Sequence, residues 1–279
     1  MTLTACVSQQ SSFQASPDKQ RVAQAFSQAS YAYSQQALVQ QSIADHLIDR
    51  LSNGFDLNQV KQAIDIGCGT GYVTHQLAKP GQRWTGIDIA EGMLQHAART
   101  SPATLNTEWI LGDAEDLPCA DQSVDLAVSS MALQWVNDHH AAMRQLKRVL
   151  KHNAEAFLAI LRHDALPELH QGWQILEQGY RVNRFADRIT WQQAIQSANL
   201  RLLSVESEQF TTFHTDVFAL LHSINRIGAG VTTSDTGFRA PLKRADLKRL
   251  ADWWVVAHPN KRGLPLTYSV DFYHLQKID

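Results

Sequence analysis

The sequence predicts an α/β fold built around a mainly parallel sheet. Between residues 63 and 161, apolar segments that resemble strands alternate with segments that resemble helices. This order is typical of a parallel sheet with helices on both faces. A glycine-rich turn follows the first of these strands, and acidic residues follow the next two. Because ligands of such sheets bind outside the carboxyl ends of the strands, these turns predict a binding site there.

The predicted elements follow one another along the chain. Residues 18–50 carry Ala, Leu and Ile at helical spacing and predict a helical segment throughout. Strand-like patterns occupy residues 63–67, 84–89, 108–113, 124–130 and 156–161. Helices are predicted between them at residues 72–79, 91–99 and 138–151. After residue 165 the alternation loosens, and residues 191–208 predict one more helix–strand pair and residues 266–276 a last strand.

The composition is that of an ordinary globular protein. The chain has 279 residues, of which 44% are hydrophobic and 19% charged, and its formal net charge of −2 argues against a nucleic-acid partner held by bulk charge. It contains no run of about 18 apolar residues, so we expect no transmembrane helix and no membrane partner. The three widely spaced cysteines, Cys6, Cys68 and Cys119, fit a reducing compartment, and we expect a cytoplasmic protein. The histidines form no metal-ligand pattern, and His139–His140 is predicted to begin a helix.

The glycine-rich turn lies within AIDIGCGTGYVTHQLAK, residues 63–79. Gly67, Gly69 and Gly71 follow a predicted strand and precede a predicted helix, where glycine allows backbone N–H groups to approach a ligand. A dinucleotide-binding turn would have a glycine at the position of Tyr72. The pattern therefore favours a smaller and less anionic nucleoside ligand.

Acidic residues after the next two strands extend this prediction. Asp88 stands 21 residues after Gly67, where a carboxylate can accept hydrogen bonds from both ribose hydroxyls. Met93 could then lie against an adenine, and Asp113 could accept its exocyclic amine. Either aspartate alone could equally be a helix cap or a turn residue. Together with the glycines, in this order, they indicate a nucleoside site.

The segments AIDIGCGTG, GIDIAEGML, GDAEDLP and VDLAVSSMALQW resemble the motifs of class I S-adenosylmethionine (SAM)-dependent methyltransferases across residues 60–162. The resemblance implies a Rossmann-like seven-stranded sheet whose last strand is antiparallel, with helical lid insertions, and SAM as cofactor. It implies that the cofactor is bound by Asp65, Gly67, Cys68, Gly69, Gly71, Asp88, Ile89, Met93, Asp113, Ala114 and Ser129. Among these, Asp65 would face the methionine end and Ser129 the sulfonium.

A narrower resemblance runs from about residue 20 to the end of the chain. RVAQAFSQASYAYSQQALVQ, ALQWVND, LPELHQGW, HSINRIGAG and PLTYSVDF are similar to the malonyl-acyl-carrier-protein O-methyltransferases of biotin synthesis. This family implies methylation of the free carboxylate of a malonyl thioester on acyl carrier protein or CoA, with S-adenosylhomocysteine as product. The chain departs from the family pattern at Asn225 and Arg226, where Lys and Gly are commoner.

The chemistry of a carboxylate acceptor agrees with the residues that are present. A carboxylate with a pKa near ~4 is already ionised at neutral pH and needs no general base, so we assign no catalytic residue. Something must still bind the carboxylate, and an arginine is the natural bidentate partner. The candidates are Tyr33, His170, His222, Arg226, Arg239 and Tyr268, each of which could instead be a solvated or core side chain. Trp135 and Trp173 are expected to be core residues rather than substrate walls.

Residues 211–263 form an insertion before the last predicted strand. Residues 226–262 contain eight lysines and arginines against three aspartates. At helical spacing, Leu247, Leu250, Trp254 and His258 share one face. The basic side chains Lys243, Arg244, Lys248 and Arg249 would form either a solvated surface or a docking surface for an acidic carrier protein.

These observations predict a monomeric enzyme with the following organisation. The segments are a flexible N-terminus (1–17), a helical cap (18–58), a SAM-binding core (59–164), the rest of the core with a helical insertion (165–210), a helical lid for substrate and carrier (211–263) and a final strand (264–279). Two other functions fit the same motifs. One is a methyltransferase for a small molecule such as a quinone precursor, and the other is a SAM-binding regulatory protein without turnover.

Overall fold

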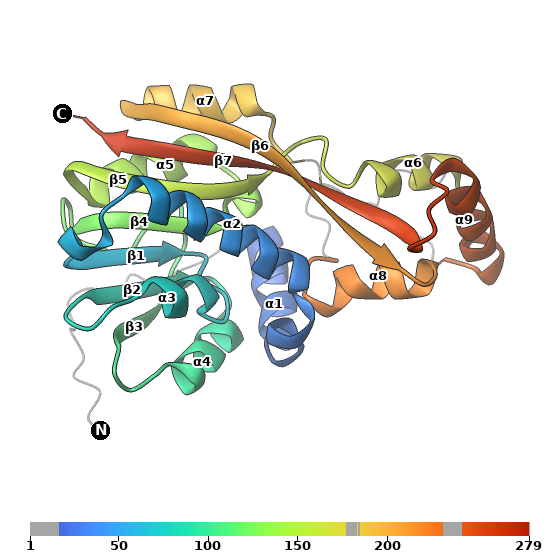
Figure 1. The fold of residues 1–279 in the computed structure, drawn as a ribbon, viewed down its shortest axis with the longest axis horizontal. Coiled ribbons are helices and arrows are strands. Elements are labelled where there is room, and N and C mark those ends of the chain that lie inside the picture. Colours follow the sequence, from blue (N-terminus) through green and yellow to red (C-terminus); the bar gives the residue numbers. More distant parts are fainter. Residues whose placement is uncertain (1–16, 177–182, 184, 231–241, 279) are drawn as a thin grey trace.

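A seven-stranded sheet forms the centre of the protein (Figure 1). The computed structural model describes residues 17–176, 183, 185–230 and 242–278. The strands are β1 (Gln62–Ile66), β2 (Arg83–Asp88), β3 (Asn106–Leu111), β4 (Val124–Ser130), β5 (Leu150–Leu161), β6 (Leu200–His214) and β7 (Leu264–Lys277), in the order β3-β2-β1-β4-β5-β7-β6. The last strand, β7, is antiparallel to both its neighbours, and the remaining pairs are parallel. The α/β fold with an antiparallel last strand is thus confirmed.

Helices cover both faces of this sheet. They are α1 (Pro17–Gln36), α2 (Leu38–Gly54), α3 (Tyr72–Leu77), α4 (Glu91–Thr100), α5 (His139–Val149), α6 (Pro167–Ile175), α7 (Arg188–Ser197), α8 (Val217–Arg226) and α9 (Arg244–Ala257). Two short 3-10 turns complete them, at Leu57–Gln59 and Leu133–Trp135. None of the described helices combines the length and the apolar composition that crossing a bilayer requires.

Alternation along the central strands divides the core into two layers. In β1, Ala63 packs with α2 and α3, whereas its neighbour Ile64 packs with α5 and α7. Successive side chains of a strand point to opposite faces, so strands buried on both faces must be apolar throughout. This explains why these strands appear in the sequence as continuous apolar runs.

Two boundaries differ from the predictions. The predicted helical segment 18–50 is divided at Ala37, which lies between α1 and α2 and is fully buried. Neither Gly nor Pro marks this break, so helical spacing alone could not reveal it. Strand β5 begins at Leu150, six residues before the predicted start, because pairing with β4 and β7 extends it through polar residues.

The insertion between β6 and β7 forms helices α8 and α9, which lie beyond one end of the sheet near α6 (Figure 1). Helix α9 buries Leu250 and Trp254, and Trp254 Nε1 donates to the Pro265 carbonyl at 3.0 Å. Lys248 and Arg249 are exposed on the other side of α9. The predicted division of this helix into an apolar and a basic face is therefore confirmed.

Candidate active site

The glycine-rich turn connects β1 to α3 at the carboxyl edge of the sheet. Gly67, Gly69 and Gly71 all have positive φ, at 69°, 53° and 84°. A Cβ atom added at Gly67 would lie 2.1 Å from the Ala132 Cβ, so only glycine fits there. The N–H of Gly67 donates to the Ile87 carbonyl at 2.7 Å, which fixes the turn against β2.

A pocket opens beside this turn, which we call the glycine-turn pocket. Of the residues predicted to bind the cofactor, those that line it are Gly67, Gly69, Asp88, Ile89, Met93, Asp113 and Ala114. Asp65 and Cys68 line a small adjoining cavity together with Gly69. Gly71 is the N-cap of α3. The Ser129 hydroxyl points away from both spaces and donates to the Ile66 carbonyl at 2.7 Å, while its neighbour Ser130 lines both.

Two carboxylates beside the pocket, the buried Asp65 and the half-buried Asp88, have no cationic partner in the described part of the chain. Asp88 accepts backbone N–H bonds from Gly69 and Ala90, each at 2.8 Å, yet burial raises its pKa to about 6. Burial also raises the pKa of Asp65 to about 7, although the Thr74 hydroxyl donates to it at 2.8 Å. Buried acids of this kind favour a ligand that brings hydroxyl donors and positive charge.

Asp113 differs from these two because a lysine already neutralises it. Lys19 Nζ lies 2.5 Å from Asp113 Oδ2 and 2.5 Å from Glu115 Oε1, and the Lys19 side chain is only 7% exposed. Asp113 Oδ1 accepts the N–H of Glu115 at 3.0 Å. Helix α1 is therefore fastened by its first turn to the loop after β3.

Only one residue, Tyr33, was identified from the sequence on the face of α1 that lines the glycine-turn pocket. Lys19, Val22, Phe26 and Tyr33 line the glycine-turn pocket, and of these only Tyr33 was a candidate. Their spacing of three, four and seven residues places them on one helix face, and this periodicity is the signal that could have identified them. Helix α1 packs so closely on α4 that a Cβ atom at Gly92 would lie 2.5 Å from the Ser27 carbonyl oxygen.

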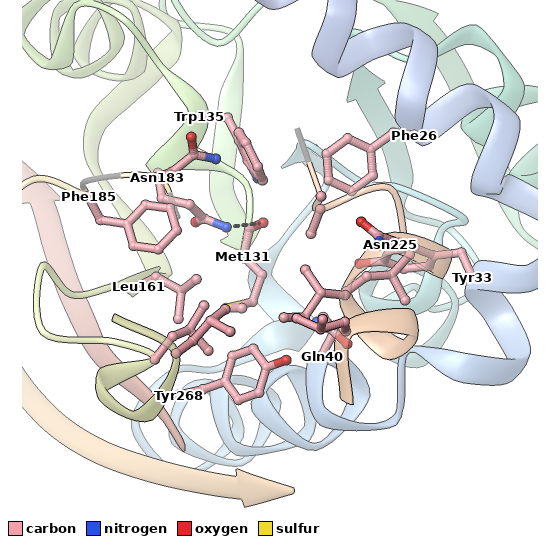
Figure 2. A pocket seen from close by; sticks show the side chains of 18 of the residues that line it. Phe26, Tyr33, Gln40, Met131, Trp135, Leu161, Asn183, Phe185, Asn225 and Tyr268 are labelled. Atoms are coloured by element: carbon pink, nitrogen blue, oxygen red, sulfur yellow. Dashed lines mark hydrogen bonds between the residues drawn. The ribbon is translucent and has the colours of Figure 1, made fainter. Parts of the chain in front are cut away.

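A second and larger space of about 340 Å³ adjoins the glycine-turn pocket (Figure 2). We call it the aromatic cavity. Its aromatic walls are Phe26, Tyr33, Trp135, Trp173, Phe185 and Tyr268. Four residues, Phe26, Tyr33, Met131 and Trp135, line both spaces, so the two meet there. Trp173 is a buried core residue, as predicted, and both Trp135 and Trp173 also line this cavity.

The orientation of helix α8 determines whether the predicted carboxylate-binding residues His222 and Arg226 face this cavity. Leu221, Ile224 and Asn225 line it, and the next stripe of the same helix carries His222 and Arg226. Both are exposed, and Arg226 lines a shallow surface hollow against α1 instead.

Of the other candidates, Tyr33 and Tyr268 line the aromatic cavity and His170 does not. Arg239 lies outside the described residues. The arginine expected to grip the carboxylate is thus not found among the described cavity residues. No group of three or more metal-ligating side chains occurs in the described part of the chain either, and His139 begins α5 behind the N-cap Asp138.

The fold and the pocket define a class I methyltransferase, whose methyl donor is SAM. The two carboxylates without a described cationic partner, Asp65 and Asp88, and the side chains of Ile89 and Met93 lie beside the glycine-rich turn. A family model described as "Methyltransferase domain" matches residues 64–158. The chain belongs to the malonyl-acyl-carrier-protein O-methyltransferase family, as the following relatives show.

Malonyl-acyl-carrier-protein O-methyltransferase of Erwinia pyrifoliae is 31% identical to this chain, and the match covers 91% of each protein. The enzyme of that name from Pseudescherichia vulneris is 32% identical over 91% of this chain and 95% of its own. The biotin biosynthesis bifunctional protein BioHC of Cellvibrio japonicus is 36% identical over 93% of this chain. The chain spans about half the length of that bifunctional relative, 50%.

Solved structures agree on the fold. A putative methyltransferase from Bacillus halodurans superimposes with a TM-score of 0.60 at 14% identity, covering 85% of this chain and 100% of that one. The YcgJ protein of Bacillus subtilis gives a TM-score of 0.56 at 18% identity, covering 78% of this chain and 92% of that one. At these identities the likeness shows the fold alone.

Proposed function

We propose that this protein transfers the methyl group of SAM to the free carboxylate of a malonyl thioester carried by acyl carrier protein. The observation that carries the proposal is the direct junction of the glycine-turn pocket with the aromatic cavity at Tyr33 and Met131. A donor in the first space and an acceptor in the second would meet at this junction. We take malonyl-acyl carrier protein as the acceptor because the relatives that match over most of their own length are named for it.

The main contribution of the protein to this reaction is to position SAM and the acceptor next to each other. When bound, SAM supplies an electrophilic methyl group, which passes to a carboxylate oxygen as the C–S bond breaks and the sulfur keeps the electron pair. The acceptor is already ionised at neutral pH, so no side chain has to remove a proton. Placing the two reactants correctly can lower the barrier by roughly 7–11 kcal/mol. The aromatic and aliphatic walls of the cavity would exclude water from the reacting atoms.

Tyr33 has the most central position in this arrangement. It lines the glycine-turn pocket, the aromatic cavity and the small cavity beside Asp65. Burial, and then the nearby Asp88, raise the pKa of its phenol, so Tyr33 keeps its proton and can donate a hydrogen bond to either ligand. We assign it to orienting the acceptor next to the donor.

The lid provides a surface for the carrier. Helix α9 and its N-cap expose Lys243, Arg244, Lys248 and Arg249. The same helix exposes two apolar side chains, Val255 at 59% and Val256 at 81%. A basic surface with apolar side chains suits an acidic carrier protein that also has an apolar contact, and Leu242, just before α9, lines the aromatic cavity.

The first experiment is methyl transfer from labelled SAM to purified malonyl- and acetyl-acyl carrier protein. We expect base-labile label on the malonyl carrier and none on the acetyl carrier, because only the malonyl group has a free carboxylate. Absence of label on both, with SAM still bound, would contradict the proposal and favour a small-molecule acceptor or a binding protein without turnover.

Charge reversal tests the docking surface. The double variant Lys248→Glu/Arg249→Glu should raise KM for malonyl-acyl carrier protein by roughly 3- to 10-fold, since exposed ion pairs contribute little individually. It should leave KM for malonyl-pantetheine unchanged, because that substrate has no carrier surface. Lys61→Glu, just before β1 at the opposite edge of the sheet, is the matched control. Equal effects on both substrates would contradict docking on α9.

A further inference from the structure

The aromatic cavity contains polar groups but no charged ones among its described lining residues. Its polar lining consists of Tyr33, Gln40, Gln134, Asn183, Asn225 and Tyr268, and the remaining side chains are apolar. No Lys, Arg or His is among the described residues of the wall. A carboxylate entering this space would therefore meet hydroxyl and amide groups within an apolar surround.

Three of these residues, Tyr33, Gln40 and Tyr268, have side-chain polar groups without a hydrogen-bond partner among the described residues. The Gln40 Oε1 atom, a hydrogen-bond acceptor, is buried and unsatisfied, so the Nε2 amide group is the part of this lining side chain that can donate to a ligand. Tyr268 is 5% exposed, and its hydroxyl points into the lower part of the cavity, where Gln40 also enters (Figure 2). By contrast, Gln134 Nε2 donates to the Met131 carbonyl at 2.6 Å. Since buried polar groups are normally hydrogen-bonded, unsatisfied groups around one cavity indicate a polar ligand.

The two phenols keep their protons in this environment. Burial raises the pKa of both Tyr33 and Tyr268, with smaller contributions from the negative charges of Asp88 and Glu168 respectively. They are thus O–H donors throughout the physiological pH range. The Gln40 amide adds an N–H donor that needs no particular pH.

We propose that the neutral donors Tyr33, Gln40 and Tyr268 bind the acceptor carboxylate. This inference rests on the proposed function. The negative charge of the carboxylate is consumed as the methyl group arrives, so a cation beside it would stabilise the ground state more than the transition state. Neutral donors in an apolar cavity hold the carboxylate through short-range hydrogen bonds, which are strong at low local dielectric.

Binding of malonyl-pantetheine to the full chain, measured by calorimetry with S-adenosylhomocysteine present, tests this inference without requiring turnover. Gln40→Glu should weaken binding by roughly 10- to 100-fold, the range expected when a hydrogen bond to a charged group is lost. Tyr268→Phe should weaken it in the same direction. Tyr268→Phe should bind S-adenosylhomocysteine like the wild type, which shows that it is folded. Gln40 also lines the small cavity beside Asp65, so the folding of Gln40→Glu is checked by circular dichroism and thermal unfolding.

Matched controls come from exposed positions of α1. Gln35→Glu makes the same chemical change as Gln40→Glu, and Tyr31→Phe the same type of change as Tyr268→Phe, at a side chain that is 75% exposed. Neither control should alter the affinity for malonyl-pantetheine. A general effect of added charge or of a lost phenol would appear in the controls as well.

The outcomes separate this inference from the proposed function. If the wild type binds malonyl-pantetheine and Gln40→Glu does not, carboxylate binding by the neutral donors is supported. That result holds even if no methyl transfer is detected, in which case only the proposed function fails. If Gln40→Glu and Tyr268→Phe both bind like the wild type, the inference is overturned. It is overturned equally if Arg239→Gln alone removes binding, or if the wild type itself does not bind malonyl-pantetheine.

Discussion

The glycine-turn pocket and the aromatic cavity share four residues but are built by opposite means. The glycine-turn pocket is formed largely by short loops after consecutive strands, and the two carboxylates beside it, the buried Asp65 and the half-buried Asp88, lack cationic partners in the described chain. The aromatic cavity is formed mainly by α1, α2, α6, α8 and β7, and its described wall holds no charge. Under the proposed function, the first space receives the cationic donor and the second the anionic acceptor.

Under the two proposals, a single site brings two charged reactants together with fixed counter-charges for the donor alone. Bare carboxylates near the donor favour its positive charge. Neutral donors near the acceptor leave its negative charge available for the reaction. The variants below are expected to separate the two halves, or to show that they depend on each other through α1.

The largest effect is expected from Asp88→Asn. Two hydrogen bonds from ribose hydroxyls to a charged group would be lost or weakened, so the affinity for SAM should fall by roughly 100-fold or more. Calorimetry with S-adenosylhomocysteine measures this directly. Asp49→Asn, at an exposed position of α2, is the control. Malonyl-pantetheine binding that fell equally would refute the separation of the two halves.

An intermediate effect is expected from Gly92→Ala, because α1 contributes Phe26 and Tyr33 to both spaces. The added Cβ would lie 2.5 Å from the Ser27 carbonyl oxygen, so α1 must move away from α4. Overpacking of this kind typically costs about 1–3 kcal/mol. We expect KM to rise for SAM and for the malonyl substrate together. A change confined to SAM would show that α1 serves only the glycine-turn pocket.

The smallest effect is expected from Asp65→Asn in the absence of ligand, and it concerns how the free energy of unfolding changes with pH. Because the folded pKa of about 7 lies above the unfolded value, the folded protein holds the proton more tightly. This contribution to stability is complete below pH ~4 and is lost as the pH rises towards 7.

Urea unfolding at pH 5.5, 6.5 and 7.5 measures the consequence. The free energy of unfolding of Asp65→Asn, relative to the wild type, should increase with pH by at most about 1.4 kcal/mol per pH unit. The negative charge of the nearby Asp88 contributes less than burial to the raised pKa of Asp65. A constant difference across these pH values would show that Asp65 is ionised in the folded protein.

The two spaces also differ in how well the sequence predicted them. The strands and the turn at Gly67 were predicted correctly because a buried parallel strand must be apolar and a backbone turn at positive φ requires glycine. The break at Ala37 was missed, since no Gly or Pro marks it. Lys19 and Phe26 were missed because their partners lie far away in the chain; Lys19 and Asp113 are 94 positions apart.

By itself, the sequence determined the sheet, the glycine turn and the acidic residues of the first pocket, because short-range periodicity and backbone geometry encode each of them. Only the tertiary structure decided which side chains enclose the aromatic cavity. Helix α8 places Leu221 and Ile224 in the cavity wall, Asn225 between the cavity and the surface hollow, and Arg226 in that hollow alone. Strand β7 contributes Tyr268 to the same wall as Gln40 of α2. The rotation of a helix about its axis and the pairing of distant strands depend on packing of the whole core, which no local pattern records.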